Sequence, residues 1–386
     1  MRHQSPQGST WQAWALASLR AEERRSAGTH LRAVPLVGAA GIRLYLKDES
    51  GQPTGSLKHR LARALFAYAL CNGWIDAGTL VVDASSGSTA VSEAYFAQLL
   101  GLPFVAVMPA GTSAEKCALI ERYGGRCHFV AEPGAAYAAA AAIAVEQGGC
   151  YLNQFAHAER ATDWRRDNIA ADILAQLADE PHPEPRWFVC GAGTGGTATT
   201  IGRHLRHAGR ASQLCVVDPQ ASVFHRHFYD RAITTAPGPA SVIEGIGRQQ
   251  LEPSFLPDVV DRMIAVSDAD AIAAARHLAA WTGLSCGPST GANLQGCLVL
   301  IDEMRAAGEQ GTVVSLLCDA GSRYLSTSLD PGLHIIRLCF HHAPCRGADS
   351  AIACTVYIHV CHVNARQPER ASAGPAADGR RPPARA

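Results

Sequence analysis

Short apolar runs alternate with longer amphipathic runs along most of the chain, from about residue 31 to residue 317. The short runs predict β-strands and the longer runs predict α-helices. The predicted strands span residues 44–46, 80–82, 104–108, 127–130, 150–152, 187–190, 214–217 and 312–317. The predicted helices span residues 11–19, 57–70, 90–100, 113–123, 135–147, 164–178 and 292–301, with another after residue 197. This alternation indicates an α/β fold, in which parallel or mixed sheets are covered by helices.

Three polar loops follow predicted strands. They are a lysine-containing turn at residues 51–60, a hydroxyl-rich loop at residues 85–89 and a glycine-rich loop at residues 193–197. Ligands of α/β proteins bind at the carboxyl ends of the strands. We therefore expect all three loops at the ligand-binding edge of the sheets.

The turn at residues 51–60, Gly-Gln-Pro-Thr-Gly-Ser-Leu-Lys-His-Arg, ends one strand and begins a helix that Ser56 can cap. Lys58 then falls in the first helical turn, where the helix dipole disfavours a cation and lowers the pKa of a lysine. The chain has 34 Lys and Arg residues, but only Lys47, Lys58 and Lys116 are lysines. An amine at this position indicates a nucleophile for carbonyl groups. A solvated lysine at a helix end is the alternative.

The glycine-rich loop, Gly193-Thr-Gly-Gly-Thr197, connects a predicted strand to a helix. Its backbone N–H groups can approach a phosphate closely, and the helix N-terminus favours an anion. A plain tight turn is one alternative. Another is a dinucleotide-binding fingerprint, because Gly191, Gly193 and Gly196 fit G-x-G-x-x-G and Asp218 ends the next strand. An NAD(P) site would leave the lysine turn unexplained.

The hydroxyl-rich loop, Ser85-Ser-Gly-Ser-Thr89, has hydroxyl groups at four of five positions and no charge. This composition suits a carboxylate held by neutral donors, and an extended helix cap is the alternative. Ser289 precedes another predicted helix and reads by itself as a cap. Cys318 follows a buried strand and is expected to pack there rather than act as a nucleophile.

Composition narrows the class of protein. The chain has 386 residues, of which 47% are hydrophobic, and this is enough for two domains or one two-lobed unit. Its formal net charge of +0 argues against nucleic acid or an anionic membrane as a partner. No apolar run reaches the length of a membrane span, and the 13 cysteines are scattered. We expect a cytoplasmic enzyme that acts on a small molecule.

Taken together, these motifs resemble those of the fold-type II pyridoxal-phosphate enzymes, in the cysteine synthase and cystathionine β-synthase branch. The resemblance covers residues 30–330 and adds three motifs to the loops above: Glu244-Gly-Ile-Gly247, Ser289 before Thr-Gly, and Ser322-Arg-Tyr-Leu-Ser-Thr327. It implies a two-lobed fold similar to the tryptophan synthase β-subunit. The variants around Lys58 and Ser88 also resemble the bacterial cysteine desulfhydrases of this family.

The resemblance implies a role for each matching residue. Lys58 resembles the lysine that forms a Schiff base with pyridoxal phosphate and moves the proton at the substrate's Cα. The phosphate would be held by Gly193, Thr194, Gly195, Gly196 and Thr197, and the pyridine nitrogen would contact Ser289. The substrate would be bound by Ser85, Ser86, Gly87, Thr89 and Gly245, with Gln154 helping to hold its carboxylate. No residue is expected to bind a metal in the catalytic unit.

Ser88 departs from the family pattern, which usually has asparagine at this position. The asparagine hydrogen-bonds the 3′ oxygen of the cofactor. Ser88 is still expected to contact the cofactor, but with one shorter donor in place of an amide. This departure leaves room for a relative that runs the family's chemistry in the lytic direction.

Ser289 favours chemistry at Cβ. A serine hydroxyl cannot keep the ring nitrogen protonated as a carboxylate would, so the ring is a weaker electron sink. A weaker electron sink slows least those reactions in which a group leaves from Cβ, because the electrons depart with that group. We therefore expect β-elimination or β-replacement on L-cysteine or an O-activated serine through an aminoacrylate, with cysteine giving sulfide, ammonia and pyruvate. A cysteine synthase is the alternative, and an NAD(P)-dependent enzyme or a non-catalytic binding protein is a more remote one.

The resemblance also implies a domain organisation. Residues 1–330 would form the catalytic unit, with a large lobe of about 1–50 and 158–330 and a small lobe of about 51–157. A homodimer is the family expectation. Residues 331–386 lie beyond the resemblance and end in a stretch rich in Ala, Pro and Arg, so we expect an unstructured tail or sequence from a non-native reading frame. Irregularly spaced Cys and His residues leave a metal site there as an alternative.

Overall fold

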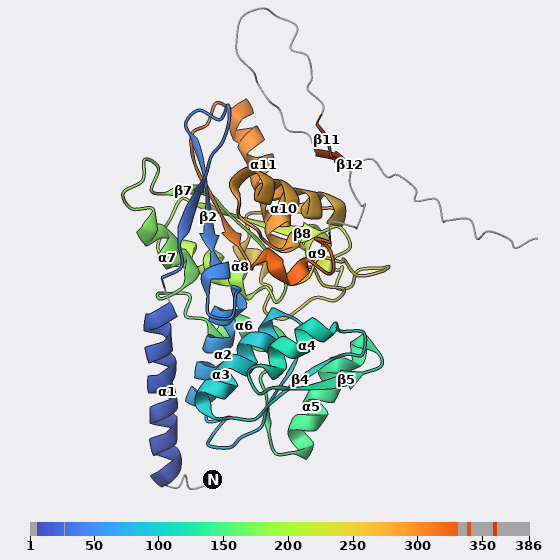
Figure 1. The fold of residues 1–386 in the computed structure, drawn as a ribbon. Helices are drawn as coiled ribbons and strands as arrows, with labels where there is room; N and C mark the ends of the chain where they lie inside the picture. Colours follow the sequence, from blue (N-terminus) through green and yellow to red (C-terminus); the bar gives the residue numbers. More distant parts are fainter. Residues whose placement is uncertain (1–5, 27, 331–337, 341–357, 361–386) are drawn as a thin grey trace, which may run out of the picture.

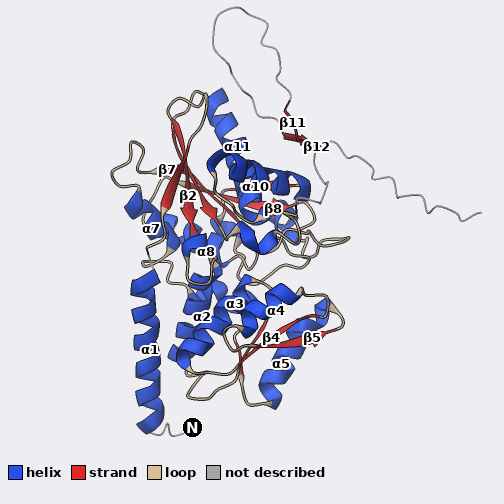
Figure 2. Cartoon of the chain, in the orientation of Figure 1, coloured by secondary structure: helices blue, strands red, loops and turns tan. Residues whose placement is uncertain are grey.

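Two β-sheets and the helices around them organise the computed structural model, which describes residues 6–26, 28–330, 338–340 and 358–360. Figure 1 shows the six-stranded sheet and the four-stranded sheet in separate halves of the molecule. Helices lie around both sheets (Figure 2). The α/β fold expected from the alternation of apolar and amphipathic runs is confirmed.

The larger sheet has the strand order β1-β2-β10-β7-β8-β9. Its strands are β1 (Leu31–Val34), β2 (Ile42–Asp48), β7 (Pro185–Gly191), β8 (Gln213–Pro219), β9 (Arg262–Val266) and β10 (Gly311–Leu317). β1 runs antiparallel to β2, and the other neighbouring pairs are parallel. All seven residues of β10 are buried, as is typical of a parallel strand with helices on both faces of its sheet.

Successive residues of β7 contribute to two hydrophobic cores on opposite faces of the larger sheet. Trp187 and Val189 belong to the core that includes α10 (Asp268–Thr282) and α11 (Pro288–Ala306). Phe188 and Cys190 belong to the other core, which includes α7 (Ile169–Gln176), α8 (Gly196–His207) and α9 (Val223–Tyr229). The two-residue period of the strand therefore accounts for its continuous apolar run.

The smaller sheet is parallel throughout and has the order β5-β4-β3-β6. Its strands are β3 (Val81–Ala84), β4 (Phe104–Pro109), β5 (Arg126–Val130) and β6 (Cys150–Tyr151). One face packs against α1 (Pro6–Ser26), α2 (Lys58–Cys71), α3 (Ser88–Leu100) and α4 (Ala114–Glu121), and the other face packs against α5 (Ala136–Glu146). α6 (Gln154–Ala161) contacts both α2 and α8 and so links the two halves.

Several helix starts differ from the sequence prediction. α7 begins at Ile169 rather than at residue 164, because the Asn168 side chain accepts hydrogen bonds from the N–H groups of Ala170 and Ala171. α3 begins at Ser88, two residues before the predicted start.

The sequence pattern did not predict five elements, namely the helices α6, α9 and α10 and the strands β1 and β9. Short 3-10 helices occur at Glu49–Gly51, Pro133–Ala135, Pro257–Val259 and Gly321–Tyr324.

Two predicted caps are wrong. α2 begins at Lys58 after Leu57 and has no side-chain cap, whereas Ser56 pairs with Asp319 in an isolated β-bridge. Ser289 lies inside the first turn of α11, which begins at Pro288 and also lacks a side-chain cap. Both serines are buried, so their hydroxyl groups belong to the interior rather than to exposed helix ends.

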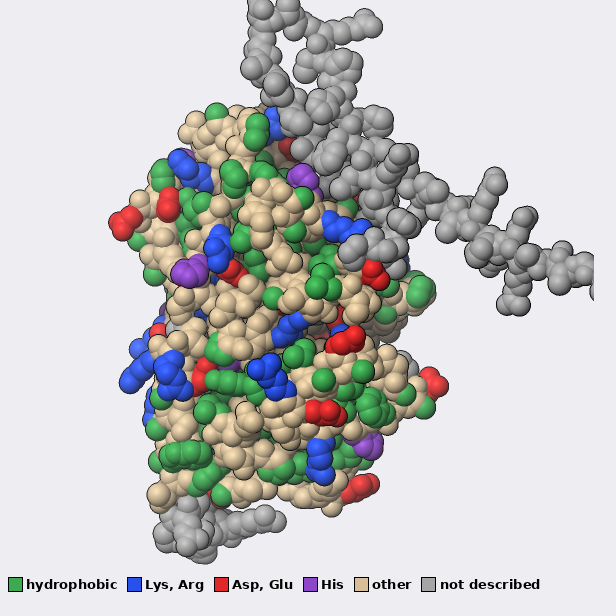
Figure 3. All heavy atoms as spheres, in the orientation of Figure 1, with side chains coloured by type: hydrophobic (Ala, Val, Ile, Leu, Met, Phe, Trp, Pro, Cys, Tyr) green, Lys and Arg blue, Asp and Glu red, His purple; other side chains and the backbone are tan. Residues whose placement is uncertain are grey.

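Most of the predicted C-terminal tail lies outside the described residues, as does the metal site considered for it. Within the tail, β11 (Leu338–Phe340) and β12 (Ile358–Val360) are described and pair antiparallel. Of the helices that the structure describes, none is long and apolar enough to cross a bilayer. On the face in Figure 3, Lys and Arg side chains lie among Asp and Glu side chains, in keeping with the formal net charge of +0.

Candidate active site

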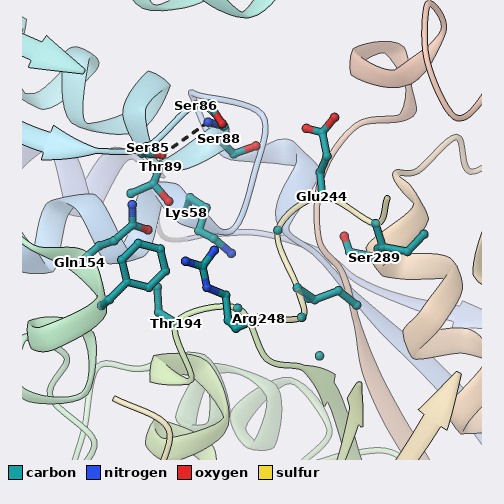
Figure 4. A pocket seen from close by; sticks show the side chains of 18 of the residues that line it. Lys58, Ser85, Ser86, Ser88, Thr89, Gln154, Thr194, Glu244, Arg248 and Ser289 are labelled. Carbon is teal, nitrogen blue, oxygen red and sulfur yellow. Dashed lines mark hydrogen bonds between the residues drawn. The ribbon is translucent and has the colours of Figure 1, made fainter. Parts of the chain in front are cut away.

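A cavity of about 630 Å³ lies among the carboxyl ends of β3, β4, β7 and β10 and brings the predicted site residues together. Its lining includes Lys58, Ser85, Ser86, Gly87, Ser88, Thr89, Gln154, Gly193, Thr194, Gly195, Thr197, Gly245 and Ser289. Gly196 instead lines a neighbouring cavity, which shares Lys58, Thr194 and Thr197 with the first. Figure 4 shows that the labelled side chains converge from both halves of the molecule.

Lys58 is the first residue of α2 and is partly buried in the wall of the cavity. Its turn is fixed to the end of β10, because the N–H of Leu57 donates to the carbonyl of Cys318 at 2.9 Å. Burial lowers the pKa of Lys58, while nearby Cys318 and Asp319 act in the opposite direction. Because its pKa is lowered, Lys58 loses its proton more readily, and the neutral amine can act as a nucleophile or a base.

The glycine-rich loop runs directly into the N-terminus of α8. A Cβ atom on Gly193 would lie 2.1 Å from the carbonyl oxygen of Gly245, and one on Gly195 would lie 2.4 Å from Cα of Phe255. Gly195 also has a φ of +89°, which favours glycine. The loop carries no acidic side chain, and its N–H groups open a helix, so its donor set fits a phosphate group.

The hydroxyl-rich loop forms the opposite wall, at the start of α3. Ser85 Oγ accepts hydrogen bonds from the N–H groups of Gly87 at 3.4 Å and Ala90 at 3.3 Å. Ser88 Oγ accepts from Nη1 of Arg323 at 2.7 Å, so the hydroxyl hydrogen of Ser88 is directed elsewhere. The loop therefore presents uncharged donors at a helix start, which is an arrangement that suits an anion.

Gln154 is the first residue of α6 and lies beside the hydroxyl-rich loop. Its side-chain nitrogen donates to Asp83 Oδ2 at 2.9 Å and to the carbonyl oxygen of Ala84 at 3.4 Å. The sequence suggested that this residue helps to hold a substrate carboxylate. In this structure the side-chain nitrogen is hydrogen-bonded within the protein, and the role of Gln154 in binding a carboxylate stays a prediction.

Ser289 is 4% exposed and lies beside Cys318 at the end of the cavity formed by α11 and β10. Burial and nearby Asp319 raise the pKa of the Cys318 thiol to about 11, despite opposing effects of Lys58 and Ser289. Cys318 Sγ also accepts from the side-chain amide of Asn293 at 3.3 Å. These contacts agree with the prediction that Cys318 packs rather than acts as a nucleophile.

Arg248 is a cavity residue that sequence reasoning missed. Its Nε donates to Glu252 at 2.8 Å, its Nη2 donates to the hydroxyl of Tyr137, and its guanidinium lies 4.3 Å from the ring centre of Phe155. Tyr137 also donates to Glu252 at 2.9 Å. Arg248 directly follows the Glu244-Gly-Ile-Gly247 motif, which was a usable signal, whereas Tyr137 lies in an alanine-rich helix without one.

Two more contacts bridge the halves at the cavity. Lys116 on α4 pairs with Glu244 at 2.7 Å, and both residues line the cavity. Arg323 reaches from the larger half to Ser88 and to the carbonyl oxygen of Thr54. Lys116 could have been singled out as one of three lysines, and Arg323 lies inside a recognised motif.

The structure gives no support to the dinucleotide alternative. Asp218, the residue expected to bind a ribose, is 0% exposed and accepts a hydrogen bond from the N–H of His225 at 2.8 Å. It is not part of the cavity wall. Among the described residues, no group of three or more His, Cys, Asp and Glu side chains is arranged to hold a metal ion.

Comparisons with known proteins agree with the motifs. The family model described as "Pyridoxal-phosphate dependent enzyme" matches residues 25–319. The L-cysteine desulfhydrase Cds1 of Mycobacterium tuberculosis (strain ATCC 25177 / H37Ra) is 57% identical over 323 residues, which cover 82% of this chain and 88% of that protein. The cysteine synthase of Aquifex aeolicus (strain VF5) is 30% identical over 296 residues, which cover 75% of this chain and 84% of that protein.

Among solved structures, a mutant hydrogen sulfide-producing enzyme in complex with an α-aminoacrylate intermediate has a similar fold. Its TM-score is 0.72 at 25% identity, and the match covers 82% of this chain and 92% of that chain. The glycine-rich loop at a helix start, the lysine at another helix start and these likenesses agree with one another. The chain belongs to the pyridoxal-phosphate dependent enzyme family, in its cysteine synthase group.

Proposed function

We propose that the protein is an L-cysteine desulfhydrase, which converts L-cysteine and water to sulfide, ammonia and pyruvate. The observation that carries this proposal is the 57% identity to the mycobacterial L-cysteine desulfhydrase, which extends over 82% of this chain. The cavity adds support, because it combines an amine of lowered pKa, a phosphate-type loop and an uncharged anion loop.

The cavity residues fit pyridoxal phosphate. The loop at residues 193–197 would hold the phosphate, Ser289 would contact the ring nitrogen, and Ser88 would contact the ring from the opposite wall. When bound, the cofactor supplies a carbonyl group for the substrate amine and an electron-withdrawing ring that acidifies the Cα proton. A Cβ atom at Gly193 would overlap the carbonyl oxygen of Gly245, so this position of the loop requires glycine.

Lys58 is proposed as the catalytic base. Its Nζ takes the proton from Cα of the substrate, while the hydroxyl-rich loop, with Ser85, Ser86 and Thr89, holds the carboxylate. The electrons of the broken Cα–H bond form a Cα–Cβ double bond, and the Cβ–S bond breaks so that sulfur leaves as hydrosulfide. Lys58 returns its proton to Cβ of the unsaturated product, water adds at Cα, and loss of ammonia leaves pyruvate.

Ser289 supports elimination over reactions that need a long-lived carbanion. Ser289 is buried in the first turn of α11. At this position it would offer the ring nitrogen a hydroxyl group instead of a carboxylate. A hydroxyl does not keep a ring nitrogen protonated, so negative charge at Cα is best relieved by departure of a group from Cβ.

Cysteine synthesis from O-acetylserine and sulfide is the second candidate. The likeness to the Aquifex cysteine synthase favours it, because the same elimination step begins both reactions. The two functions differ in whether water or sulfide completes the turnover.

An assay of the purified holoenzyme with L-cysteine alone tests the proposal, with sulfide and pyruvate followed together. Matched release of both products is the expected result. No release, with cysteine formed instead from O-acetylserine and sulfide, would overturn the desulfhydrase proposal in favour of the synthase.

We further propose that the protein is a homodimer in a reducing, cytoplasmic compartment. We also propose the two lobes, a large lobe of about residues 1–50 and 158–330 and a small lobe of about residues 51–157. Support comes from the resemblance to the family and from the nine free cysteines of the described chain. Light scattering of the purified protein would measure the oligomeric state. A monomer at micromolar concentration would contradict the homodimer.

A further inference from the structure

Two cysteines meet on one face of the smaller sheet. Cys117 lies on α4 and Cys127 on the neighbouring strand β5, and both pack against the same hydrophobic core. Their thiols are within hydrogen-bonding reach of each other. Cys117 Sγ also lies 3.9 Å from Sδ of Met108, which is buried on β4, so the side chain of Cys117 is directed toward the sheet. The two thiols therefore point toward each other, as the formation of a disulfide requires.

The pair is open to reagents in solution. Of the nine free cysteines that the structure describes, six are buried and Cys71 is exposed at the end of α2. Cys117 and Cys127 are half-buried. Neither of them lines the active-site cavity. A change at these two thiols therefore leaves the groups that would contact cofactor and substrate in place.

The surroundings of the two thiols set the order in which they react. Burial raises the pKa of Cys127 to about 12, and the charge of Cys117, a hydrogen bond to it and the charge of Glu121 add to this effect. Cys127 therefore stays protonated, and Cys117 supplies the first thiolate. Once Cys117 has reacted and carries no charge, its contribution to the raised pKa of Cys127 is gone.

The helix α4 connects this pair to the active site. Lys116, the residue before Cys117, pairs with Glu244 at 2.7 Å, and both of these side chains line the cavity. α4 has eight residues and no side-chain cap at its start, and β5 is an edge strand of its sheet. The sulfur atoms must approach to roughly 2 Å when a disulfide forms. This approach draws α4 and β5 together and moves Lys116 with α4.

We propose that Cys117 and Cys127 are a site of reversible oxidation, at which a small-molecule disulfide joins them in a bridge that weakens the contact between Lys116 and Glu244. The Cys117 thiolate attacks one sulfur of the reagent and displaces one small thiolate. Cys127 then attacks the Cys117 sulfur of the mixed disulfide and displaces the second small thiolate. The two protein thiols are oxidised, the reagent is reduced to two small thiols, and these take up the two protons.

Peptide mapping without reductant tests the modification in wild-type holoenzyme that has been treated with bis(2-hydroxyethyl) disulfide. This reagent has no amino group, so it cannot react with the cofactor as an amino acid does. Trypsin cleaves after Lys116, Arg122 and Arg126 and places the two thiols in separate peptides, residues 117–122 and 127–160. The expected product is this pair of peptides joined by a disulfide. Separate hydroxyethyl adducts, or free thiols at both positions, would overturn the proposal.

Three variants control the mapping. Cys117→Ser should give no joined pair, because Cys127 then has no thiol partner. Cys71→Ala removes an exposed thiol elsewhere and should leave the joined pair unchanged. The peptide of Cys127 also contains the buried Cys150. A joined pair that persists in Cys127→Ser would therefore assign the bridge to Cys150 and overturn the proposal.

The effect on the active site is measured as pyruvate release from β-chloro-L-alanine, which has no thiol that could reduce the bridge. The side chains of Lys116 and Glu244 are 25% and 35% exposed, so loss of their contact should lower kcat/KM about threefold, and added reductant should restore it. Lys116→Met should show the same decrease when reduced and no further decrease when oxidised. An unchanged kcat/KM in oxidised wild-type protein would overturn the link between the bridge and Lys116.

The mapping needs no turnover, so it separates this inference from the proposed function. Amide hydrogen exchange is measured on the same oxidised and reduced samples, and exchange at residues 244–248 should become faster on oxidation. The absence of sulfide release from reduced protein with L-cysteine would overturn the desulfhydrase proposal alone. The absence of the joined peptides would overturn the oxidation site alone.

Discussion

At the scale of single residues, the chemistry depends on the surroundings of Lys58. Burial lowers the pKa of this lysine, and its turn is fixed to the end of β10. Lys58→Ala should abolish the absorbance band of the cofactor that disappears on borohydride treatment, and should lower kcat by at least about 10³-fold. Lys116→Ala removes another lysine of the same cavity and should keep the band. A band that persists without Lys58 would show that another amine binds the cofactor.

Asp218 predicts a pH dependence of stability that is independent of the active site. Burial raises its pKa to about 7, although hydrogen bonds from Ser222 and from the first turn of α9 act against this shift. Between about pH 4 and pH 7 the folded state holds a proton at Asp218 that the unfolded state releases, so the free energy of unfolding falls as the pH rises through this window. Asp218→Asn should abolish this fall in the free energy of unfolding, which is on the order of 4 kcal/mol.

Urea unfolding at pH 4.5 and pH 7.5 measures this effect in wild type and variant. The variant should gain stability relative to wild type as the pH rises. Asp258→Asn is the control, because the side chain of Asp258 is 90% exposed. A wild-type and an Asp218→Asn protein with the same pH dependence would contradict the prediction.

Site residues could be predicted where a local pattern marks them. Lys58, Ser85 and Gly193 belong to short motifs beside a strand end, and all three line the cavity. Asp83 and Tyr137 carry no such mark. They matter because of partners about 70 and 115 residues away in the sequence, and only the packing of the two halves creates those contacts.

At the scale of secondary-structure elements, a buried series of hydrogen bonds connects α1 to the turn at residues 51–60. Glu22 on α1 accepts from Nε2 of His59 at 2.8 Å, and Nδ1 of His59 lies 3.2 Å from the hydroxyl of Thr54. Thr54 and Ser92 on α3 share a further hydrogen bond at 2.8 Å. All four residues are buried, so each depends on these partners for its hydrogen bonds.

Glu22→Ala should therefore destabilise the protein by about 2–3 kcal/mol, because it leaves His59 and Arg63 without their buried partner. Glu23→Ala is a closely matched control on the same helix. The side chain of Glu23 is 39% exposed where it pairs with Arg63, so its loss should cost less than about 1 kcal/mol. Denaturant unfolding measures the free energy of unfolding of both variants. Equal decreases in the two would mean that Glu22 does not connect α1 to the rest of the protein.

Element types followed from the apolar pattern better than element boundaries did. The start of α7 is set by the side chain of Asn168, and the preceding residues form a turn in which Asp167 has a φ of +54°. α6 is only eight residues long and was missed, although Asn153 caps it with a hydrogen bond from the N–H of Ala156. Short helices carry too few apolar positions for a clear period.

At the scale of the whole molecule, the two sheets are joined around the cavity rather than through one continuous core. The hydrophobic clusters of the smaller sheet and those of the larger sheet share no buried residue. Polar contacts span the gap beside the cavity, including Lys116 with Glu244 and Arg323 with Ser88. The sequence indicated two lobes from family likeness, but the residues that join them follow only from the structure.

Arg248 bridges the two halves and has a buried acidic partner. It lies in the larger half, pairs with Glu252, which is 2% exposed, and donates to Tyr137 on α5 of the smaller half. Arg248→Met would leave the Glu252 carboxylate buried without its cation and should cost about 2–3 kcal/mol of unfolding free energy. Amide hydrogen exchange should become faster in α5 and at residues 244–252, where the two halves meet.

Arg231→Met provides a matched comparison, because Arg231 also lies over an aromatic ring and pairs with an acid. Its partner Asp258 is exposed, so the change should stay within about 0.5 kcal/mol. A similar effect of both substitutions would mean that Arg248 does not hold the halves together. A large effect of Arg248→Met alone, with faster exchange on both sides of the cavity, would identify the Arg248, Glu252 and Tyr137 contact as a principal link between them.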